Sequence, residues 1–171
     1  MIKYFVNEDY VKAEKQAKIT LIIYFISLFV MLLISAGLVI WYRTLPYKSP
    51  TITVVKIIHY VAAALYVAFS FAYLGIVYKR VNRYRKLCKN LLNGIKETNR
   101  ASFVEVDLSP HDKDGVDCHA LIFLEWNERK QDYFERKVLL LAEKPVPDIP
   151  ENANVRFVTQ GNVLIEYEIT D

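Results

Sequence analysis

Residues 19–42 read ITLIIYFISLFVMLLISAGLVIWY, a run of 24 residues without a charged side chain. At about 1.5 Å of rise per residue, a helix of this length exceeds the roughly 30 Å hydrocarbon core of a bilayer. A second run, residues 57–78, is 22 residues long and holds only His59 as a group that can become cationic. Two such runs so close together predict a transmembrane hairpin, whereas the core helices of a soluble protein are rarely this long and this apolar.

A cleaved signal peptide is the main alternative for the first run, because Ser35-Ala36-Gly37 is a small-residue sequence of the kind found at cleavage sites. The apolar stretch is much longer than the roughly 7–15 residues of a signal peptide. Eighteen residues, acidic ones among them, also precede it. We therefore expect the first run to remain as a membrane span.

We predict transmembrane helices at residues 19–42 and 54–78, joined by a short external loop at residues 43–53. Pro46 and Pro50 keep either helix from continuing through that loop. Basic residues gather before the first span and after the second, and the heavier basic clusters stay on the cytoplasmic side. We expect a multi-pass protein of the plasma membrane with both termini in the cytoplasm.

Charge divides the chain into two parts. Residues 1–96 hold 14 Lys and Arg against 3 Asp and Glu, whereas residues 97–171 hold 8 against 16. This division excludes a uniform soluble globule and a disordered chain. The two cysteines are far apart and have no CxxC spacing, which argues against a disulfide framework or a zinc cluster.

Small residues mark a candidate contact surface on the membrane helices. Ala64, Ala68 and Ala72 recur every four residues on the second span, and Gly37 lies in a small-residue patch of the first. Small side chains let helix backbones approach within lipid. The predicted interface is either within the hairpin or between protomers of a homo-oligomer.

Two cytoplasmic helical segments flank the spans. Residues 1–18 are predicted to contain an amphipathic helix, and residues 79–100 a basic helical stalk that continues the second span. Apolar stalk residues at spacings of 3 and 4 form a short coiled-coil seam: Val81, Tyr84, Cys88, Leu91 and Ile95. Its partner is either the N-terminal segment or the same stalk in another subunit. The stalk residues expected to contact anionic lipid are Lys79, Arg80, Arg83, Arg85 and Lys86. Because this basic stretch adjoins a span and alternates with apolar residues, we expect no nucleic-acid binding.

Residues 101–171 change to a period of two, which is typical of β-strands. We expect strands at residues 103–108, 118–126, 133–141, 155–159 and 163–169. They are separated by a loop at residues 109–117, a polar turn at 127–130 and a proline-rich connector at 144–154. Val104, Val106 and Leu108 are predicted to face inward on the first strand, and Val163, Ile165, Tyr167 and Ile169 on the last.

The predicted fold class is therefore an α+β membrane protein: a two-helix transmembrane hairpin, a cytoplasmic helical stalk and a small five-stranded antiparallel β domain. Closure into a barrel of the OB or SH3-like kind is favoured, because an open sheet of this size exposes its edges.

The chain shows little that indicates chemistry. His111, Asp112 and Asp114 are weak metal-ligand candidates, but the spacing of a calcium loop is absent. Cys118 and His119 are adjacent in a strand and so point to opposite faces. No nucleophile, phosphate-binding or zinc-peptidase motif is present in the sequence, and we expect neither enzymatic activity nor a cofactor.

We therefore expect a membrane-anchored binding or assembly module that presents the β domain to a cytosolic protein partner, with membrane lipids as its surroundings. The alternative is a small oligomeric channel or transporter component. In that case His59 and Lys56, near the outer end of the second span, are the candidate residues for transport.

Overall fold

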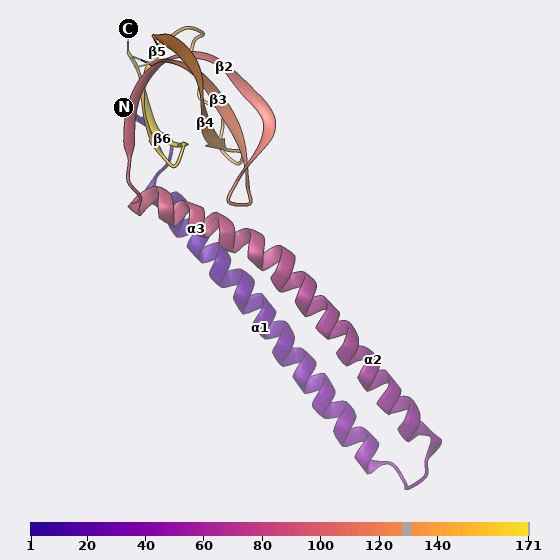
Figure 1. Cartoon of the computed structure of the whole chain (residues 1–171). Helices are drawn as coiled ribbons and strands as arrows, with labels where there is room; N and C mark the ends of the chain where they lie inside the picture. The colour runs from indigo at the N-terminus through magenta and orange to yellow at the C-terminus, as the bar shows by residue number, and fades with distance from the viewer. Residues whose placement is uncertain (128–130, 171) are drawn as a thin grey trace. The chain divides into compact units, whose positions relative to one another are not determined.

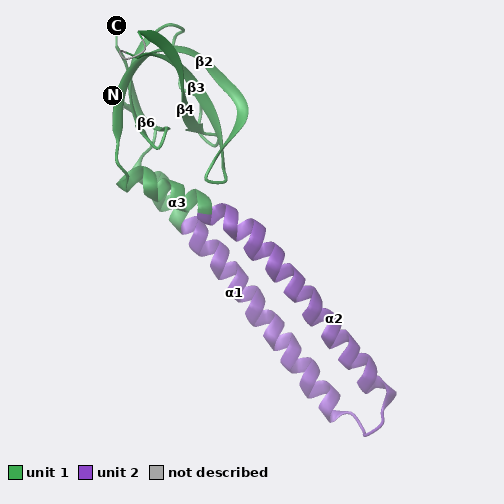
Figure 2. Ribbon diagram, in the orientation of Figure 1, with its two compact units in different colours: residues 1–14, 83–171 green, residues 15–82 purple. Residues whose placement is uncertain are grey.

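The computed structural model describes residues 1–127 and 131–170. The chain forms two compact units, a helical unit of residues 15–82 and a barrel unit that joins residues 1–14 to residues 83–171 (Figure 2). In sequence, the helical unit is thus an insertion within the barrel unit.

The helices are α1 (Asn7–Thr44), α2 (Pro50–Ala72), the π-helical segment η1 (Tyr73–Tyr78) and α3 (Lys79–Asn93) (Figure 1). Two helical stretches, Asn7–Thr44 and Pro50–Asn93, are long and apolar enough to cross a membrane. Few of their apolar side chains are fully buried, so burial inside the helical unit does not account for its hydrophobicity.

The link between α1 and α2 is shorter than the predicted loop at residues 43–53. Pro50 occupies the first turn of α2, where a missing N–H costs nothing because it has no intrahelical partner. The helix therefore begins at the proline instead of after it. The π-helical segment has no counterpart in the prediction, because its altered hydrogen bonding leaves no periodicity signal in six residues.

Polar side chains join α1 to the second half of the hairpin. On α2 and η1 these residues recur every seven positions, so they share one helix face. The contacts are Ser35 Oγ to His59 Nε2 at 3.4 Å, Ser27 Oγ to Tyr66 Oη at 3.1 Å, and the Tyr73 hydroxyl to the Thr20 carbonyl oxygen at 3.0 Å.

The small residues do not form the hairpin contact. Ala64, Ala68, Ala72 and Gly37 are exposed, and nothing lies within 4 Å of a Cβ placed on Gly37. The version of the prediction that put these residues between α1 and α2 is therefore wrong. Hydrogen-bonding side chains hold the two helices instead.

The barrel unit contains a closed five-stranded β-barrel (Figure 1). Its strands are β2 (Glu97–Lys113), β3 (Val116–Asn127), β4 (Asp132–Leu141), β5 (Asn154–Gln160) and β6 (Val163–Thr170). β2 pairs with both β3 and β5, and β6 pairs with β5 and with β4. The β4–β6 pairing is parallel, which corrects the prediction of a wholly antiparallel domain.

β2 is longer than predicted at both ends. It begins at Glu97, so the helical stalk ends at Asn93 and does not reach residue 100. It continues through most of the expected loop at 109–117, which shrinks to a turn at Asp114 and Gly115, both with positive φ. Asp-Gly favours this two-residue hairpin turn, so the polar residues before it remain in the strand. Of the predicted turn at residues 127–130, all but Asn127 lies outside the described residues.

A register shift between Phe103 and Glu105 changes which face of β2 is buried. Ala101 and Phe103 lie in the core with Val106 packed against it, whereas Leu108 is 62% exposed. A β-bulge inserts one residue and so breaks strict alternation. A second irregularity between Asp107 and His111 interrupts the alternation again before Leu108 can follow Val106 inward. The predicted inward face of Val104, Val106 and Leu108 is therefore wrong except at Val106.

The barrel core centres on three phenylalanines, among which Phe123 stacks on Phe157 with ring centroids 4.5 Å apart. β6 buries both of its faces. Leu164 and Tyr167 contact this core, whereas Val163 and Ile165 belong to a second cluster formed with helix residues. The single inward face predicted for the last strand is wrong because both sides of β6 are covered.

The N-terminal segment is part of the barrel unit. A short strand β1 (Ile2–Lys3) pairs with β6, and the Tyr4 and Phe5 amides both donate to the Ile165 carbonyl oxygen. The Lys144 ammonium group donates to the Tyr4 carbonyl and to the Asp9 carboxylate. The predicted separate segment at residues 1–18 is thus divided: residues 1–14 complete the barrel unit and the remainder belongs to the helical unit.

Candidate functional site

A groove of about 390 Å³ crosses the outer face of the barrel. Every strand of the closed barrel contributes to it. Its lining consists of Arg100, Ala101, Ser102, Leu124, Trp126, Tyr133, Asn154 and Thr170.

Two aromatic side chains line this groove. Trp126 of β3 and Tyr133 of β4 are paired across the strands, with ring centroids 4.9 Å apart in an edge-to-face arrangement. Trp126 is 45% exposed and Tyr133 61% exposed. Their position at the ends of neighbouring strands leaves both rings outside the barrel core, so a large apolar surface faces solvent.

Basic and polar side chains also line the groove. Arg100 of β2 is directly opposite Arg156 of β5, and within the described part of the chain neither guanidinium has an ion-pair or hydrogen-bond partner. Like charges in this position repel. Ser102 Oγ donates to Asn154 Oδ1 at 3.0 Å, which leaves the amide nitrogen of Asn154 available as a donor.

An arginine on the inward face of β4 supports these strands from within. Arg136 is half-buried and pairs with Glu125 of β3 at 3.0 Å and with Glu97 of β2 at 3.4 Å. Its guanidinium carbon lies 5.8 Å from the centroid of the Phe157 ring. These ion pairs connect β2, β3 and β4 beneath the groove, which favours a preorganised surface.

Sequence reasoning did not find this groove. Its residues come from five strands, and only the closed barrel places β5 beside β2 and β6 beside β5. The available signal was the pair Trp126 and Tyr133 on either side of a predicted turn, which is the arrangement of cross-strand neighbours in a hairpin.

The predicted stalk seam divides between packed and exposed positions. Tyr84, Cys88 and Leu91 contact a cluster that includes Phe5 of the N-terminal segment. Val81 is half-buried, whereas Ile95 is 89% exposed because it lies beyond the end of α3. Within the chain, the packed part of the seam thus contacts the N-terminal segment and the barrel strands.

The two cysteines are buried in this same cluster. Burial raises the pKa of the Cys88 thiol to about 11, partly offset by a hydrogen bond with Tyr84. Burial also raises the pKa of the Cys118 thiol to about 11. Both thiols therefore stay protonated at neutral pH, which makes them poor nucleophiles and poor metal ligands.

The weak metal-ligand candidates make hydrogen bonds and a turn within the β2–β3 hairpin. His111 Nε2 lies 2.9 Å from Asp107 Oδ2, and Asp112 accepts a hydrogen bond from the Gly115 amide at 3.1 Å. Asp114 occupies the turn with φ 56°. Within residues 1–127 and 131–170, no group of three or more His, Cys, Asp or Glu side chains is arranged to hold a metal ion.

Asp107 organises a bulged stretch of β2. Its carboxylate accepts hydrogen bonds from the Ser109 hydroxyl and amide, and it also contacts His111 and Lys137. Hydrogen bonds from Ser109 and then His111 hold the pKa of the Asp107 carboxyl well below its usual range. Ser109 and His111 both contact the Asp107 carboxylate. The Ser109 hydroxyl and the Asp107 carboxylate in turn contact the same imidazole nitrogen, Nε2 of His111. That geometry differs from a catalytic triad, in which the carboxylate and the nucleophile contact different imidazole nitrogens.

The predicted lipid-contact residues have different surroundings. Lys79, Arg80 and Lys86 are exposed, and Arg85 is half-buried. Arg83 lies against the β2–β3 hairpin, where a Cβ added at Gly115 would overlap its guanidinium group.

Comparison of the chain with protein-family models, with curated proteins and with solved structures finds no match.

Proposed function

We propose that this chain is an integral membrane protein that uses its helical unit as an anchor and its barrel as a binding module for a cytosolic protein. The observation that carries the proposal is the groove that exposed Trp126 and Tyr133 line together with Arg100, a guanidinium without a partner among the described residues. Tryptophan, tyrosine and arginine are the residue types that contribute most to binding energy at protein interfaces.

Membrane insertion is supported by the exposure of the apolar helices. A soluble protein rarely leaves such large apolar surfaces in water, whereas lipid solvates them. The composition of the barrel unit supports the predicted topology, because residues 1–14 and 83–171 pack together and must lie on the same side of a bilayer. The basic residues flanking the spans favour the cytoplasmic side of the plasma membrane.

Of the two barrel types considered, the connectivity favours the OB type. A simple meander places each strand beside the one before it in sequence. Here β5 returns to pair with β2, and β6 inserts between β5 and β4. This Greek-key connectivity is typical of OB barrels, which use an outer strand face for binding.

The net excess of acidic residues in residues 97–171 argues for a protein ligand, since nucleic-acid binding surfaces are strongly basic. We further propose that the protein has no catalytic activity of its own.

The binding role is tested by photo-crosslinking from the groove in cells. A photoreactive phenylalanine analogue at Tyr133 is expected to form a specific adduct that is lost in Arg100→Glu and in Trp126→Ala. The matched control is Leu108→Ala, because Leu108 is also an exposed apolar residue of the barrel but does not line the groove. Adducts that persist in both groove variants would contradict the proposal.

Insertion and topology are tested separately. The full-length chain is expected to stay with membranes in alkaline carbonate, and Ser49→Cys to react with an impermeant thiol reagent on intact cells. Release into carbonate, or labelling only after lysis, would contradict the anchor or its orientation.

The alternative function, an oligomeric channel or transporter component, draws support from the exposed small-residue face at Ala64, Ala68 and Ala72. Against it, the polar side chains of the helices already contact one another within the hairpin. Solute flux into liposomes that is abolished by His59→Ala would favour this alternative.

A further inference from the structure

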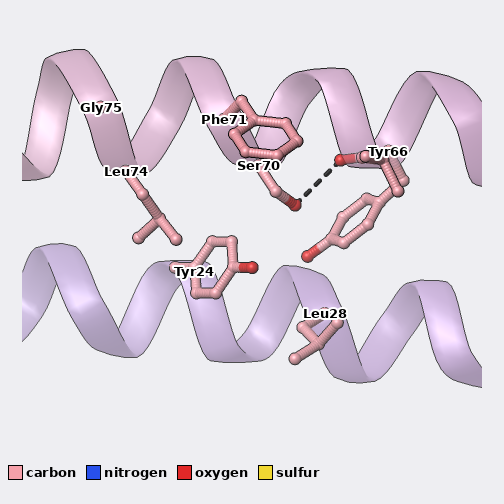
Figure 3. A pocket seen from close by; sticks show the side chains of 8 residues that line it. Tyr24, Leu28, Tyr66, Ser70, Phe71, Leu74 and Gly75 are labelled. Carbon is pink, nitrogen blue, oxygen red and sulfur yellow. Dashed lines mark hydrogen bonds between the residues drawn. The ribbon is translucent and has the colours of Figure 1, made fainter.

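The helical unit contains an apolar cavity of about 470 Å³ between α1 and the second half of the hairpin (Figure 3). Tyr24 and Leu28 of α1 form one wall, and Tyr66 and Phe71 of α2 form another. Gly75 of η1 completes the cavity, and nothing lies within 4 Å of a Cβ placed there. The glycine thus leaves open a space that any larger residue would enter.

The cavity lies where the helix departs from α-helical geometry. η1 begins at Tyr73, and Leu74 and Gly75 are its second and third residues. Short π-helical segments cost hydrogen-bond quality and occur frequently at functional sites. The π-helical segment therefore forms part of the cavity wall, and the lack of a side chain at Gly75 enlarges the cavity.

The charges of the helical unit indicate what would occupy the cavity. Residues 15–82 contain no acidic residue, and basic residues follow Gly75 within about one helical turn, at Lys79 and Arg80. Lys15 and Lys18 precede Tyr24 on α1. An apolar cavity with cations beyond one end complements a molecule that has a hydrocarbon chain and an anionic headgroup.

A transmembrane helix of a partner is a poorer fit. Helices in lipid associate through small residues that allow close backbone approach. The stripe of Ala64, Ala68 and Ala72 does not line this cavity, whose walls carry the bulky rings of Tyr66 and Phe71.

We propose that the cavity binds one acyl chain of an anionic phospholipid whose phosphate lies at Lys79. This inference rests on the proposed membrane insertion. The lipid chain fills space that the protein leaves empty, so dispersion contacts hold the chain while the basic residues select the headgroup.

The test uses native mass spectrometry of the full-length protein in mild detergent, with phosphatidylglycerol or phosphatidylcholine added. The wild type is expected to retain one phosphatidylglycerol and to bind phosphatidylcholine more weakly. Gly75→Leu is expected to lower phosphatidylglycerol retention about tenfold. The control is Gly37→Leu, because Gly37 also has open space around its Cβ position but does not line the cavity. Retention in this control is expected to stay within about twofold of the wild type.

A second variant leaves the cavity intact in case Gly75→Leu fails to fold. Lys79→Gln is expected to reduce the preference for phosphatidylglycerol over phosphatidylcholine while total lipid binding persists. Equal losses in the two glycine variants would overturn the proposal, as would unchanged retention in Gly75→Leu and Lys79→Gln. A change in oligomeric mass with lipid retention unaltered would identify another helix as the occupant and would also overturn it. Carbonate extraction of the wild type distinguishes the two failures: release shows that insertion fails, whereas retention without bound lipid shows that only the lipid site fails.

Discussion

The helical unit and the barrel unit place their apolar residues in opposite environments. In the barrel, Phe123 and Phe157 are 0% exposed, whereas Phe29 of α1 and Phe71 of α2 are 62% and 77% exposed. Burial in the barrel removes apolar surface from water, whereas the apolar side chains of the helices lie mostly outside any protein core. The same residue type therefore has a different energetic role in each unit, and substitutions should separate the two roles.

The largest expected effect is that of a truncated core ring. Phe123→Ala should lower the free energy of unfolding of the barrel unit by about 3–5 kcal/mol, because Phe123 contacts both Phe103 and Phe157 and leaves a cavity when removed. Phe29→Ala should cost less than about 1 kcal/mol in detergent micelles, since the ring contacts apolar solvent before and after unfolding. Denaturant unfolding followed by near-ultraviolet circular dichroism measures both. Equal losses would mean that Phe29 is packed against protein.

The next effect concerns the contact of Lys144, in the connector between β4 and β5, with the N-terminal segment. Lys144→Ala should cost about 1.5–3 kcal/mol, because it removes charge-assisted hydrogen bonds to Tyr4 and leaves Asp9, whose side chain is only 16% exposed, without its cation. Hydrogen exchange of residues 1–14 should increase. Lys137→Ala is the control, since its side chain is 51% exposed and its contact with Asp107 is long, at 3.4 Å. That surface pair should contribute at most about 1 kcal/mol, and a comparable loss in both variants would contradict the assignment.

A smaller effect is expected at the β2–β3 turn. Gly115→Ala should destabilise the barrel unit by about 1–2 kcal/mol, because φ is 78° there and the new Cβ overlaps the Arg83 guanidinium. The double variant Arg83→Ala with Gly115→Ala should recover part of the loss, which a double-mutant cycle on the thermal midpoint measures. Strict additivity would show that backbone strain alone is responsible.

The smallest effect is the acid response of Asp107. Its pKa is lower in the folded state than in the unfolded state, so the carboxylate stabilises the fold at neutral pH, and that contribution is lost as the pH falls below about 4. Asp107→Asn should reduce the pH dependence of the thermal midpoint between pH 4 and pH 2. The reduction should be small, because solvent screens this carboxylate. Glu151→Gln, at an exposed position, should leave the profile of the wild type unchanged. Identical profiles for Asp107→Asn and the wild type would contradict the role of Asp107.

Regular patterns made much of the architecture predictable. Long uncharged runs predicted two helices apolar enough to cross a membrane, and alternation predicted the barrel strands. The failures occur where one residue disturbs a pattern. The bulge after Phe103 moves the buried face to Val106, a second irregularity between Asp107 and His111 leaves Leu108 exposed, and Asp114-Gly115 replaces an expected loop with a tight turn. A single-residue shift reverses the faces of a strand without changing its composition.

The sequence by itself determined the division of this chain into apolar helices and a β domain. Apolar runs, basic flanks and a period of two are each visible within a few neighbouring residues. Only the tertiary structure decided that residues 1–14 complete the barrel unit, that polar side chains instead of alanines join α1 to α2, and that Arg100, Trp126 and Tyr133 share one groove. These features depend on closing the barrel and pairing the helices, which bring together residues that are far apart along the chain. Their contacts come from strand register and helix facing, and neither leaves a signal within one short segment.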